Sequence, residues 1–374
     1  MVVVLFSVLW VVMAAWIALT ALPAGREGHM PMPYLIALVP FLWIPLVGLA
    51  VWAAVLHQWM IVVAMLFLAL AASSRRMQYW GTGITVQSPV ARSSTTQSSA
   101  ARRGAPQPQQ TTGRRSNAAS ERSTAQSSRS LENDINCGDH VLELGVPFTV
   151  MTLNCRYGRA DAAHIVREVR ERHIGVLALQ ELTGELVDRL DAAGLSDLLP
   201  YRQLGEERNT DNGGFNGVWT AYRPVSSLAN AVDIPAADVP SITIALDGTN
   251  RTITFVSAHP KSPMRGCAQW SEGIRGLGAL ASAAQSATAD SVVLMGDLNS
   301  GTDHPSFRAL LQSGFTDASL AWAHGPNLSF PSWLPWPRIE LDHILFTRGF
   351  KVAHVESFVV TDTDHLAVTA TLSL

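Results

Sequence analysis

Two long runs without a charged residue constrain this 374-residue chain more than any other feature. Residues 1–25 contain no Asp, Glu, Lys or Arg, and neither do residues 28–74. A helix needs about 20 apolar residues to cross the hydrocarbon core of a bilayer. We therefore expect three transmembrane helices: Val2–Leu22, about Tyr34–Val55 and about Leu56–Ser73, with a turn at His57-Gln58.

The same start could instead be a cleaved signal peptide followed by a hydrophobic hairpin. A signal peptide opens with a basic stretch, and the chain has no Lys or Arg before Arg26. We therefore favour a membrane anchor over residues 1–81, with the lipid bilayer as its partner.

A polar stretch follows the apolar runs. Residues 82–134 are rich in Ser, Thr, Gln and Arg and have few large apolar residues, so we expect a disordered linker, most clearly over about Thr82–Ser130. Residues 74–134 carry nine arginines against three acidic residues. Such a linker could lie on anionic lipid or a phosphate-rich polymer, or it could be a solvated spacer, and its composition leaves both open.

Residues 135–374 have the pattern of a globular domain. Predicted strands outnumber predicted helices, and many neighbouring strands look like hairpins. This favours a mixed-sheet α/β sandwich over an all-parallel sheet. The predicted strands are Pro147–Leu153, Gly175–Leu179, Phe215–Tyr222, Ser241–Leu246, Thr252–Ala258, Ser291–Met295, Leu341–Phe346, Val352–Val360 and Leu366–Leu372, and the predicted helices are Asp161–His173, about Gly184–Ala193, Gln269–Ser286 and Pro305–Gln312.

Polar side chains follow or precede six of these strands. In the clearest case an apolar run ends in Gly296-Asp297-Leu298-Asn299, which places a carboxylate and an amide two residues apart, able to point the same way. Each strand end alone is typical of a cap or a loop, but six together indicate a site rich in hard oxygen ligands for Mg²⁺ or Mn²⁺. The other strand ends carry Asn154, Glu181, His259, Asp342 with His343, and Asp364 with His365.

From about residue 148 to 374 the chain resembles the endonuclease/exonuclease/phosphatase superfamily of metal-dependent phosphodiesterases and phosphatases. The motifs that carry the resemblance are Thr-Leu-Asn154, Leu-Gln-Glu181, Ser-Ala-His259-Pro, Gly-Asp297-Leu-Asn299, Leu-Asp342-His343-Ile and Thr-Asp364-His365, in the family's order. The resemblance implies a four-layered α/β sandwich, two sheets flanked by helices, with the site along one edge.

The resemblance also implies a role for each motif residue. Glu181 would hold the metal, Mg²⁺ or Mn²⁺, with Asn154 and Asp364 nearby. His365, oriented by Asp342, would be a general base or a phosphate contact. Asp297 would position or activate the attacking water, and Asn299 and His259 would stabilise the phosphoryl oxygens. Thr363 stands where many members have Ser, a change that keeps the hydroxyl.

The substrate is less well defined than the chemistry. Residues 135–374 carry 17 Lys and Arg against 26 Asp and Glu, which disfavours tight nonspecific DNA binding. A nucleic acid, a phospholipid or a small phosphoester remains possible as substrate, and no obligate protein partner is implied. Arg156, Arg159, Arg265 and Arg275 could form a local basic patch. The aromatic segment from Phe330 to Pro337 could cover the substrate, touch the membrane or pack over the core.

A second functional class is a catalytically silent, membrane-tethered binding module that has kept the fold. A silent relative is expected to have lost at least one ligand or the base, and here the whole set from Asn154 to His365 is present. We therefore favour a phosphoric ester hydrolase.

Cysteine usage leaves the disulfide state open. Cys137, Cys155 and Cys267 allow at most one bridge, and their spacing does not define it.

Two indications disagree about the side of the membrane. Arg26, Arg75 and Arg76 flank the predicted spans on the side of the catalytic domain, which favours the cytoplasm. The long Ser/Thr-rich linker, and the membrane-tethered relatives that the resemblance brings in, favour an extracytoplasmic domain. Because the charge bias rests on three arginines, we favour the extracytoplasmic face.

Overall fold

The computed structural model describes residues 2–81, 141–206, 214–286 and 290–374. The stretch expected to be disordered, about residues 82–130, lies outside these ranges. The N-terminal helices and the part of the chain after residue 140 belong to one compact unit.

Two N-terminal helices are long and apolar enough to cross a membrane. The first, Val2–Ala21, consists of α1 (Val2–Ala18) and the 3₁₀ turn η1 (Leu19–Ala21). The second, Trp59–Trp80, consists of α4 (Trp59–Met77) and η3 (Gln78–Trp80). It begins and ends later than the predicted Leu56–Ser73, because Arg75 and Arg76 end the apolar run without ending the helix.

The expected middle span is bent. It is made of α2 (Met32–Leu38), η2 (Val39–Phe41) and α3 (Trp43–Val55), with an angle of 56° at the break, and it counts as a third span only if both halves are taken together. Pro40 lies at the break, and a proline supplies no backbone N–H to continue the helical ladder.

Two mixed sheets form the centre of the described chain after residue 140. The six-stranded sheet has the order β12-β13-β2-β3-β5-β4, with β2 and β3 parallel. In the seven-stranded sheet the order is β1-β7-β8-β9-β11-β10, with β6 beside β7, and β8 and β9 are parallel. The six-stranded sheet consists of β2 (Phe148–Asn154), β3 (Ile174–Leu182), β4 (Tyr201–Leu204), β5 (Phe215–Thr220), β12 (Lys351–Val359) and β13 (Leu366–Ser373). The seven-stranded sheet consists of β1 (Leu142–Glu143), β6 (Pro224–Leu228), β7 (Ser241–Asp247), β8 (Thr252–Ser257), β9 (Asp290–Asp297), β10 (Thr316–Asp317) and β11 (Asp342–Phe346).

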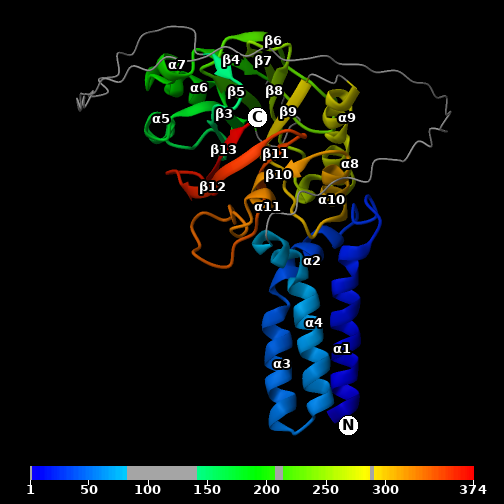
Figure 1. Cartoon of the computed structure of the whole chain (residues 1–374). Coiled ribbons are helices and arrows are strands. Elements are labelled where there is room, and N and C mark those ends of the chain that lie inside the picture. Colours follow the sequence, from blue (N-terminus) through cyan, green and yellow to red (C-terminus); the bar gives the residue numbers. More distant parts are fainter. Residues whose placement is uncertain (1, 82–140, 207–213, 287–289) are drawn as a thin grey trace, which may run out of the picture. The chain divides into compact units, whose positions relative to one another are not determined.

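The sheets pack face to face, and helices cover their outer faces (Figure 1). Val150 and Val176 of one sheet and Met295 of the other belong to the same buried cluster, which fills the space between the sheets. The outer face of the six-stranded sheet is covered by α5 (Ala162–Glu171), α6 (Gly184–Ala192) and α7 (Leu195–Leu198). The other outer face is covered by α8 (Cys267–Gly276), α9 (Gly278–Ser286) and α10 (Pro305–Gln312). The short helix α11 (Ala318–Trp322) follows β10. The predicted four-layered α/β sandwich is confirmed.

Several predicted boundaries need correction. The single helix predicted over Gln269–Ser286 is two helices, because the chain breaks at Leu277 between two glycines. Strands β4 and β6 were not predicted. The residues of β6 are mostly exposed, so its sequence carries little apolar alternation.

Candidate active site

Strand pairing brings the predicted site residues to one edge of the sandwich. In the parallel pair β2–β3, Asn154 lies beside Gln180, so Glu181 follows at the same edge. In the other sheet, Asp342 at the start of β11 lies opposite Asp297 at the end of β9. His259 comes just after β8, whose parallel partner is β9, and His365 comes just before β13, whose antiparallel partner is β2.

Asn154 links Glu181 to Asp297. Its side-chain nitrogen donates to Glu181 Oε1 at 3.2 Å and to Asp297 Oδ2 at 3.0 Å. Glu181 sits at an irregularity in the β3–β5 pairing, with a positive φ of 53°. Such bulges re-aim side chains next to functional sites. The backbone N–H of Tyr157 donates to Glu181 Oε2 at 2.9 Å, which fixes the carboxylate from the other side.

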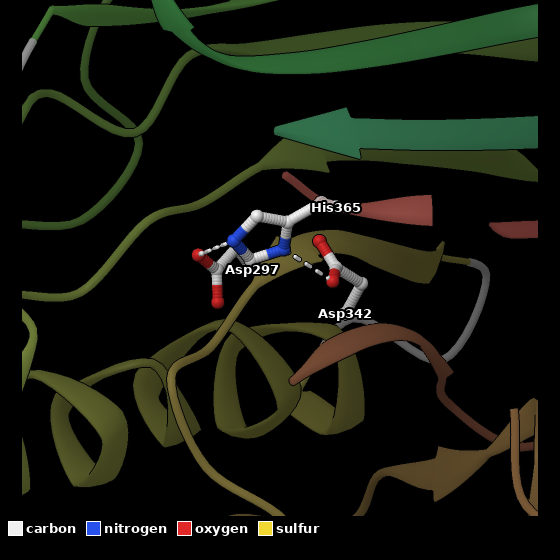
Figure 2. A group of neighbouring side chains, drawn as sticks. All are labelled: Asp297, Asp342 and His365. Carbon is white, nitrogen blue, oxygen red and sulfur yellow. Dashed lines mark hydrogen bonds and ion pairs between the residues drawn. The ribbon is translucent and has the colours of Figure 1, made fainter. Parts of the chain in front are cut away.

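His365 lies between two buried carboxylates (Figure 2). Its Nδ1 is 2.7 Å from Asp342 Oδ2, and its Nε2 is 3.7 Å from Asp297 Oδ2. Asp342 is therefore in contact with one ring nitrogen, and Nε2 faces Asp297.

His259 and Asn299 complete the surroundings of Asp297. His259 Nε2 is 3.4 Å from Asp297 Oδ2 and 3.9 Å from Glu181 Oε1. The backbone N–H of Asn299 donates to Asp297 Oδ1 at 2.9 Å, and its side-chain nitrogen donates to the Pro260 carbonyl at 3.3 Å. In this conformation Asn299 holds the carboxylate of Asp297 with its main chain, and its side chain is held by the loop after His259.

Electrostatics set the charge of these groups. Burial alone would lower the pKa of the His365 imidazole, but the Asp342 and Asp297 carboxylates outweigh it and raise that pKa to about 10. Burial would raise the pKa of Asp297, but the charge of His365 and the hydrogen bond from His259 hold it well below its usual range. The site therefore pairs an ionised Asp297 with a charged His365 at neutral pH.

Asp364 is the predicted site residue that stands somewhat apart. Its carboxylate lies 3.7 Å from Arg156 Nε and is partly exposed. Within the described parts of the chain it makes no hydrogen bond to Asn154 or Glu181.

A cleft of about 710 Å³ lies next to Glu181. It is lined by Arg156, Tyr157, Gly158, Arg159, Thr183, Gly184, Glu185, Arg189 and Asp362. Of the predicted basic patch, Arg156 and Arg159 line this cleft, whereas Arg265 and Arg275 are not among its lining residues.

His343, beside Asp342 in the sequence, points away from the site. Its Nδ1 is 2.7 Å from Asp317 Oδ2 and its Nε2 is 2.7 Å from the Ser300 carbonyl. Neighbouring residues of a strand face opposite sides of the sheet, which separates the two side chains.

Three supporting residues were not singled out as site residues. The Thr363 hydroxyl donates to the Asn154 carbonyl at 2.6 Å and accepts from the His365 N–H at 3.3 Å. It therefore links the segment that carries Asn154 to the segment that carries His365. Ser329 Oγ accepts from the Asp342 N–H at 3.2 Å. Gln180 donates to Ser257 Oγ of the opposite sheet at 2.9 Å. Gln180 could have been found from the sequence, because it is a polar residue directly after a buried apolar run. No sequence pattern marks Ser329 as a supporting residue.

The donor set fits a hard divalent cation. Asp297 and Asp342 each offer a carboxylate oxygen, and these two atoms lie within 4.8 Å of each other and of a ring nitrogen of His365, which as a charged imidazolium would not be a ligand. Oδ1 of Asp342 is buried without a hydrogen-bond partner in the described structure. Glu181 adds a partly exposed carboxylate beside them. Carboxylate oxygens are the ligands that Mg²⁺ and Mn²⁺ prefer.

Two of the three cysteines form no disulfide in the described structure. Cys155 and Cys267 are buried free thiols, and Cys137 lies outside the described residues.

Comparison with known proteins agrees with this geometry. The family model described as the Endonuclease/Exonuclease/phosphatase family matches residues 151–365, more than half of the chain. The chain belongs to this family. A comparison with curated proteins gave no match.

Several solved structures are similar to part of the chain at low sequence identity. They include a humanized D. rerio TDP2 with 14 mutations (15% identity, TM-score 0.49), which covers 61% of this chain and 99% of that chain. A second is an endonuclease/exonuclease/phosphatase family protein from Leptotrichia buccalis, with 16% sequence identity and a TM-score of 0.46. The match covers 61% of this chain and 100% of that protein. A third is a mannosyl-6-phosphatase from Bacteroides thetaiotaomicron, with 16% sequence identity and a TM-score of 0.47. This match also covers 61% of this chain and 100% of the other protein. Membership of the Endonuclease/Exonuclease/phosphatase family supports a hydrolase of phosphoric esters.

Proposed function

We propose that the protein is a divalent-metal-dependent hydrolase of phosphoric esters, held in a membrane by its N-terminal helices. The observation that carries the proposal is the continuous chain of contacts from Asp342 through His365, Asp297 and Asn154 to Glu181. A phosphoric ester needs an oriented water and positive charge near its oxygens, and this arrangement offers both.

The charge and the hydrogen bonds of each residue indicate its role in hydrolysis. Asp297, ionised and held by Asn154 and Asn299, orients the attacking water by accepting a hydrogen bond from it. Both nitrogens of His365 face carboxylates, which suits a charged imidazolium. Of its two predicted roles we therefore favour contact with the phosphoryl oxygens over that of general base. His259 and the Asn299 amide, once released from Pro260, add donors to the same oxygens.

Glu181, with the Asn154 side chain and Asp364 nearby, would hold Mg²⁺ or Mn²⁺. A bound cation would neutralise charge on the phosphoryl oxygens and so favour attack on phosphorus. Asp297 and Asp342 offer further oxygen ligands to the same small volume.

The cleft beside Glu181 is where we place the part of the substrate that does not react. Arg156, Arg159 and Arg189 line it, in a chain whose residues 135–374 are otherwise acidic. Such a cleft suits one further anionic group of a small or lipid phosphoester better than a long duplex.

Membrane anchoring rests on the surface of the N-terminal helices. Val4, Val8 and Val11 of α1 are each more than half exposed, and the helix contains no charged residue. An apolar surface of this kind is stable when lipid covers it. Because a long Ser/Thr-rich linker suits a domain held outside the cell and the opposing charge bias rests on three arginines, we keep the extracytoplasmic side as a proposal.

Turnover of a panel of phosphoric esters by the full chain in detergent tests the function. The panel includes nucleic acid, phospholipid and sugar phosphates. We expect hydrolysis with Mg²⁺ or Mn²⁺, loss of activity with EDTA, and recovery when either ion is returned. The catalytically silent alternative predicts no turnover of any ester. Recovery with Zn²⁺ alone would contradict the assigned oxygen ligands.

A further inference from the structure

Residues 330–338, which we call the tryptophan loop, contact the active site at one end and the N-terminal helices at the other. Phe330, at the base of the loop, forms an antiparallel bridge with Ile339. Its ring lies 4.8 Å from the ring of His365, centroid to centroid. Near the tip, the Trp336 ring lies 6.1 Å from the ring of Phe41.

Hydrogen bonds fix the base of the loop to the segment that carries His365. The Ser332 N–H donates to the Asp364 carbonyl at 2.7 Å, and its hydroxyl donates to the Thr363 carbonyl at 2.8 Å. Inside the loop, the Arg338 guanidinium donates to the carbonyls of Pro331 and Ser332. Whatever the tip contacts is therefore held at a defined place relative to His365.

The tip exposes two tryptophans. Residues 141–374 contain five tryptophans, and Trp219 and Trp270 are buried while Trp322 is partly buried. The other two, Trp333 and Trp336, are 70% and 54% exposed. Tryptophan is the costliest side chain to leave in water, and its indole favours the boundary between lipid and water.

The ends of the candidate spans lie beside this tip. Phe41 ends η2, in the bent middle segment, and the Arg76 guanidinium carbon lies 4.9 Å above its ring. Arg75 and Arg76 are the only charged residues of α4, in its last turn. In a bilayer spanned by α4, these two arginines would lie at the headgroup level, and Trp336 would lie near that level with them.

We propose that the tryptophan loop docks on the surface of the bilayer that holds the helices, and that the substrate is a phosphoric ester carried by a membrane amphiphile. The inference rests on the proposed function for its substrate and on the contacts above for its surface. The bilayer is the occupant that the structure favours, because the exposed indole of Trp336 lies against Phe41, in the bent segment that can form a third span. Residues 135–374 are acidic, so apolar contact rather than attraction to anionic lipid would hold the loop there.

The location of the loop can be tested without measuring hydrolysis. A fluorophore is attached to Trp333→Cys in a full-length Cys137→Ser background, where Cys155 and Cys267 are buried. The protein is placed in phosphatidylcholine vesicles whose acyl chains are brominated. We expect quenching at position 333 and none for a matched label at Leu228→Cys, which is 57% exposed on β6. An unquenched label at 333, whether it faces water or a second copy of the chain, would overturn the docking.

The substrate class is tested with esters that differ only in their acyl chains. Long-chain phosphatidic acid and phosphatidylglycerol in phosphatidylcholine vesicles are compared with their water-soluble dihexanoyl forms. In the Trp333→Ala/Trp336→Ala double variant, the ratio of vesicle to soluble turnover should fall about tenfold or more, whereas Leu228→Ala should keep the wild-type ratio.

An unchanged ratio in the double variant would overturn the membrane-borne substrate. If the wild-type chain hydrolyses no ester in either form, the proposed function fails, and the quenching measurement still decides the docking.

Discussion

Gly296 and Glu181 show that the site depends on single backbone positions. Gly296 has a φ of 154°, and a Cβ added there would lie 1.9 Å from the Ala258 carbonyl oxygen. This close approach is what places His259, one residue after Ala258, beside Asp297. The sequence indicates a glycine that lets the chain turn at the end of the apolar run, whereas in the structure Gly296 still belongs to β9, opposite His343, and it is the Ala258 carbonyl that leaves no room for a Cβ. The positive φ of Glu181 could not be predicted from the sequence, because it follows from the pairing of β3 with β5.

Gly296→Ala is therefore expected to destabilise the protein by at least about 2 kcal/mol, because a buried carbonyl must move to admit the methyl group. Thermal unfolding of the full chain in detergent measures the effect. Gly184→Ala is the matched control, since no atom lies within 4 Å of its added Cβ. Equal unfolding temperatures for the two variants would show that β8 and β9 are not as close here as described.

The residue types at the strand ends could be predicted because each follows its own apolar run. Their neighbours could not, because the partners are far apart in sequence. The Thr363 hydroxyl bonds to the Asn154 carbonyl across 209 positions, and Gln180 bonds to Ser257 across 77. Such contacts depend on the packing of two sheets, which local patterns do not specify.

At the scale of elements, buried strands could be predicted and exposed ones could not. The burial of β2, β3 and β9 requires continuous apolar runs, which mark their positions within one to three residues. Strand β6 lies at a sheet edge and is mostly exposed, and β10 has two residues, so neither leaves a pattern. Strand β10 nevertheless supplies Asp317, the partner of His343 on β11.

The β10–β11 pair predicts how stability depends on pH. Burial alone would lower the pKa of His343, but the hydrogen bond to Asp317 and its charge raise it to about 9. An unfolded histidine has a pKa of about 6.5. Because the folded value is higher, this pair stabilises the fold fully below about pH 6.5, and the stabilisation is lost as the pH rises through about 9. Burial also raises the pKa of the neighbouring Glu340 from 4.5 to about 7, so the stabilisation from its protonated form is lost at lower pH, as the pH rises through about 7.

We therefore expect the unfolding temperature of the full chain to fall between about pH 6.5 and pH 9. His343→Gln should make this fall shallower, whereas His354→Gln, at an exposed position of β12, should keep the wild-type profile. A wild-type unfolding temperature that is constant over this range would contradict the charged His343–Asp317 pair.

At the scale of the whole molecule, the N-terminal helices are part of the structure that supports the site. The Ser306 N–H donates to Glu27 Oε1 at 2.5 Å, and His304 Nε2 lies 3.1 Å from the Pro33 carbonyl. Hydropathy predicted the spans but not these contacts, since polar groups at span ends look like ordinary loop residues. Removing residues 1–81 would expose these buried groups, so experiments should use the full chain.

The side of the membrane can be determined with protease added to intact cells. Our proposal of an extracytoplasmic domain predicts cleavage in the Arg-rich stretch of residues 82–134 without breaking the membrane. A known cytoplasmic protein of the same cells, which must remain uncut, is the control. Protection of the chain until lysis would place the domain in the cytoplasm, as the positive-inside rule suggests.

The most direct test of the assigned site is the turnover of phosphoric esters by full-length Glu181→Gln and His365→Ala. Loss of one positioned donor to the reacting oxygens usually costs about 10²–10³-fold in rate, and we expect each variant to lose at least about 10²-fold while remaining folded at the assay temperature. Glu171→Gln and His354→Ala, at exposed positions of α5 and β12, are the matched controls and should keep wild-type turnover. Wild-type turnover by either site variant would contradict the account.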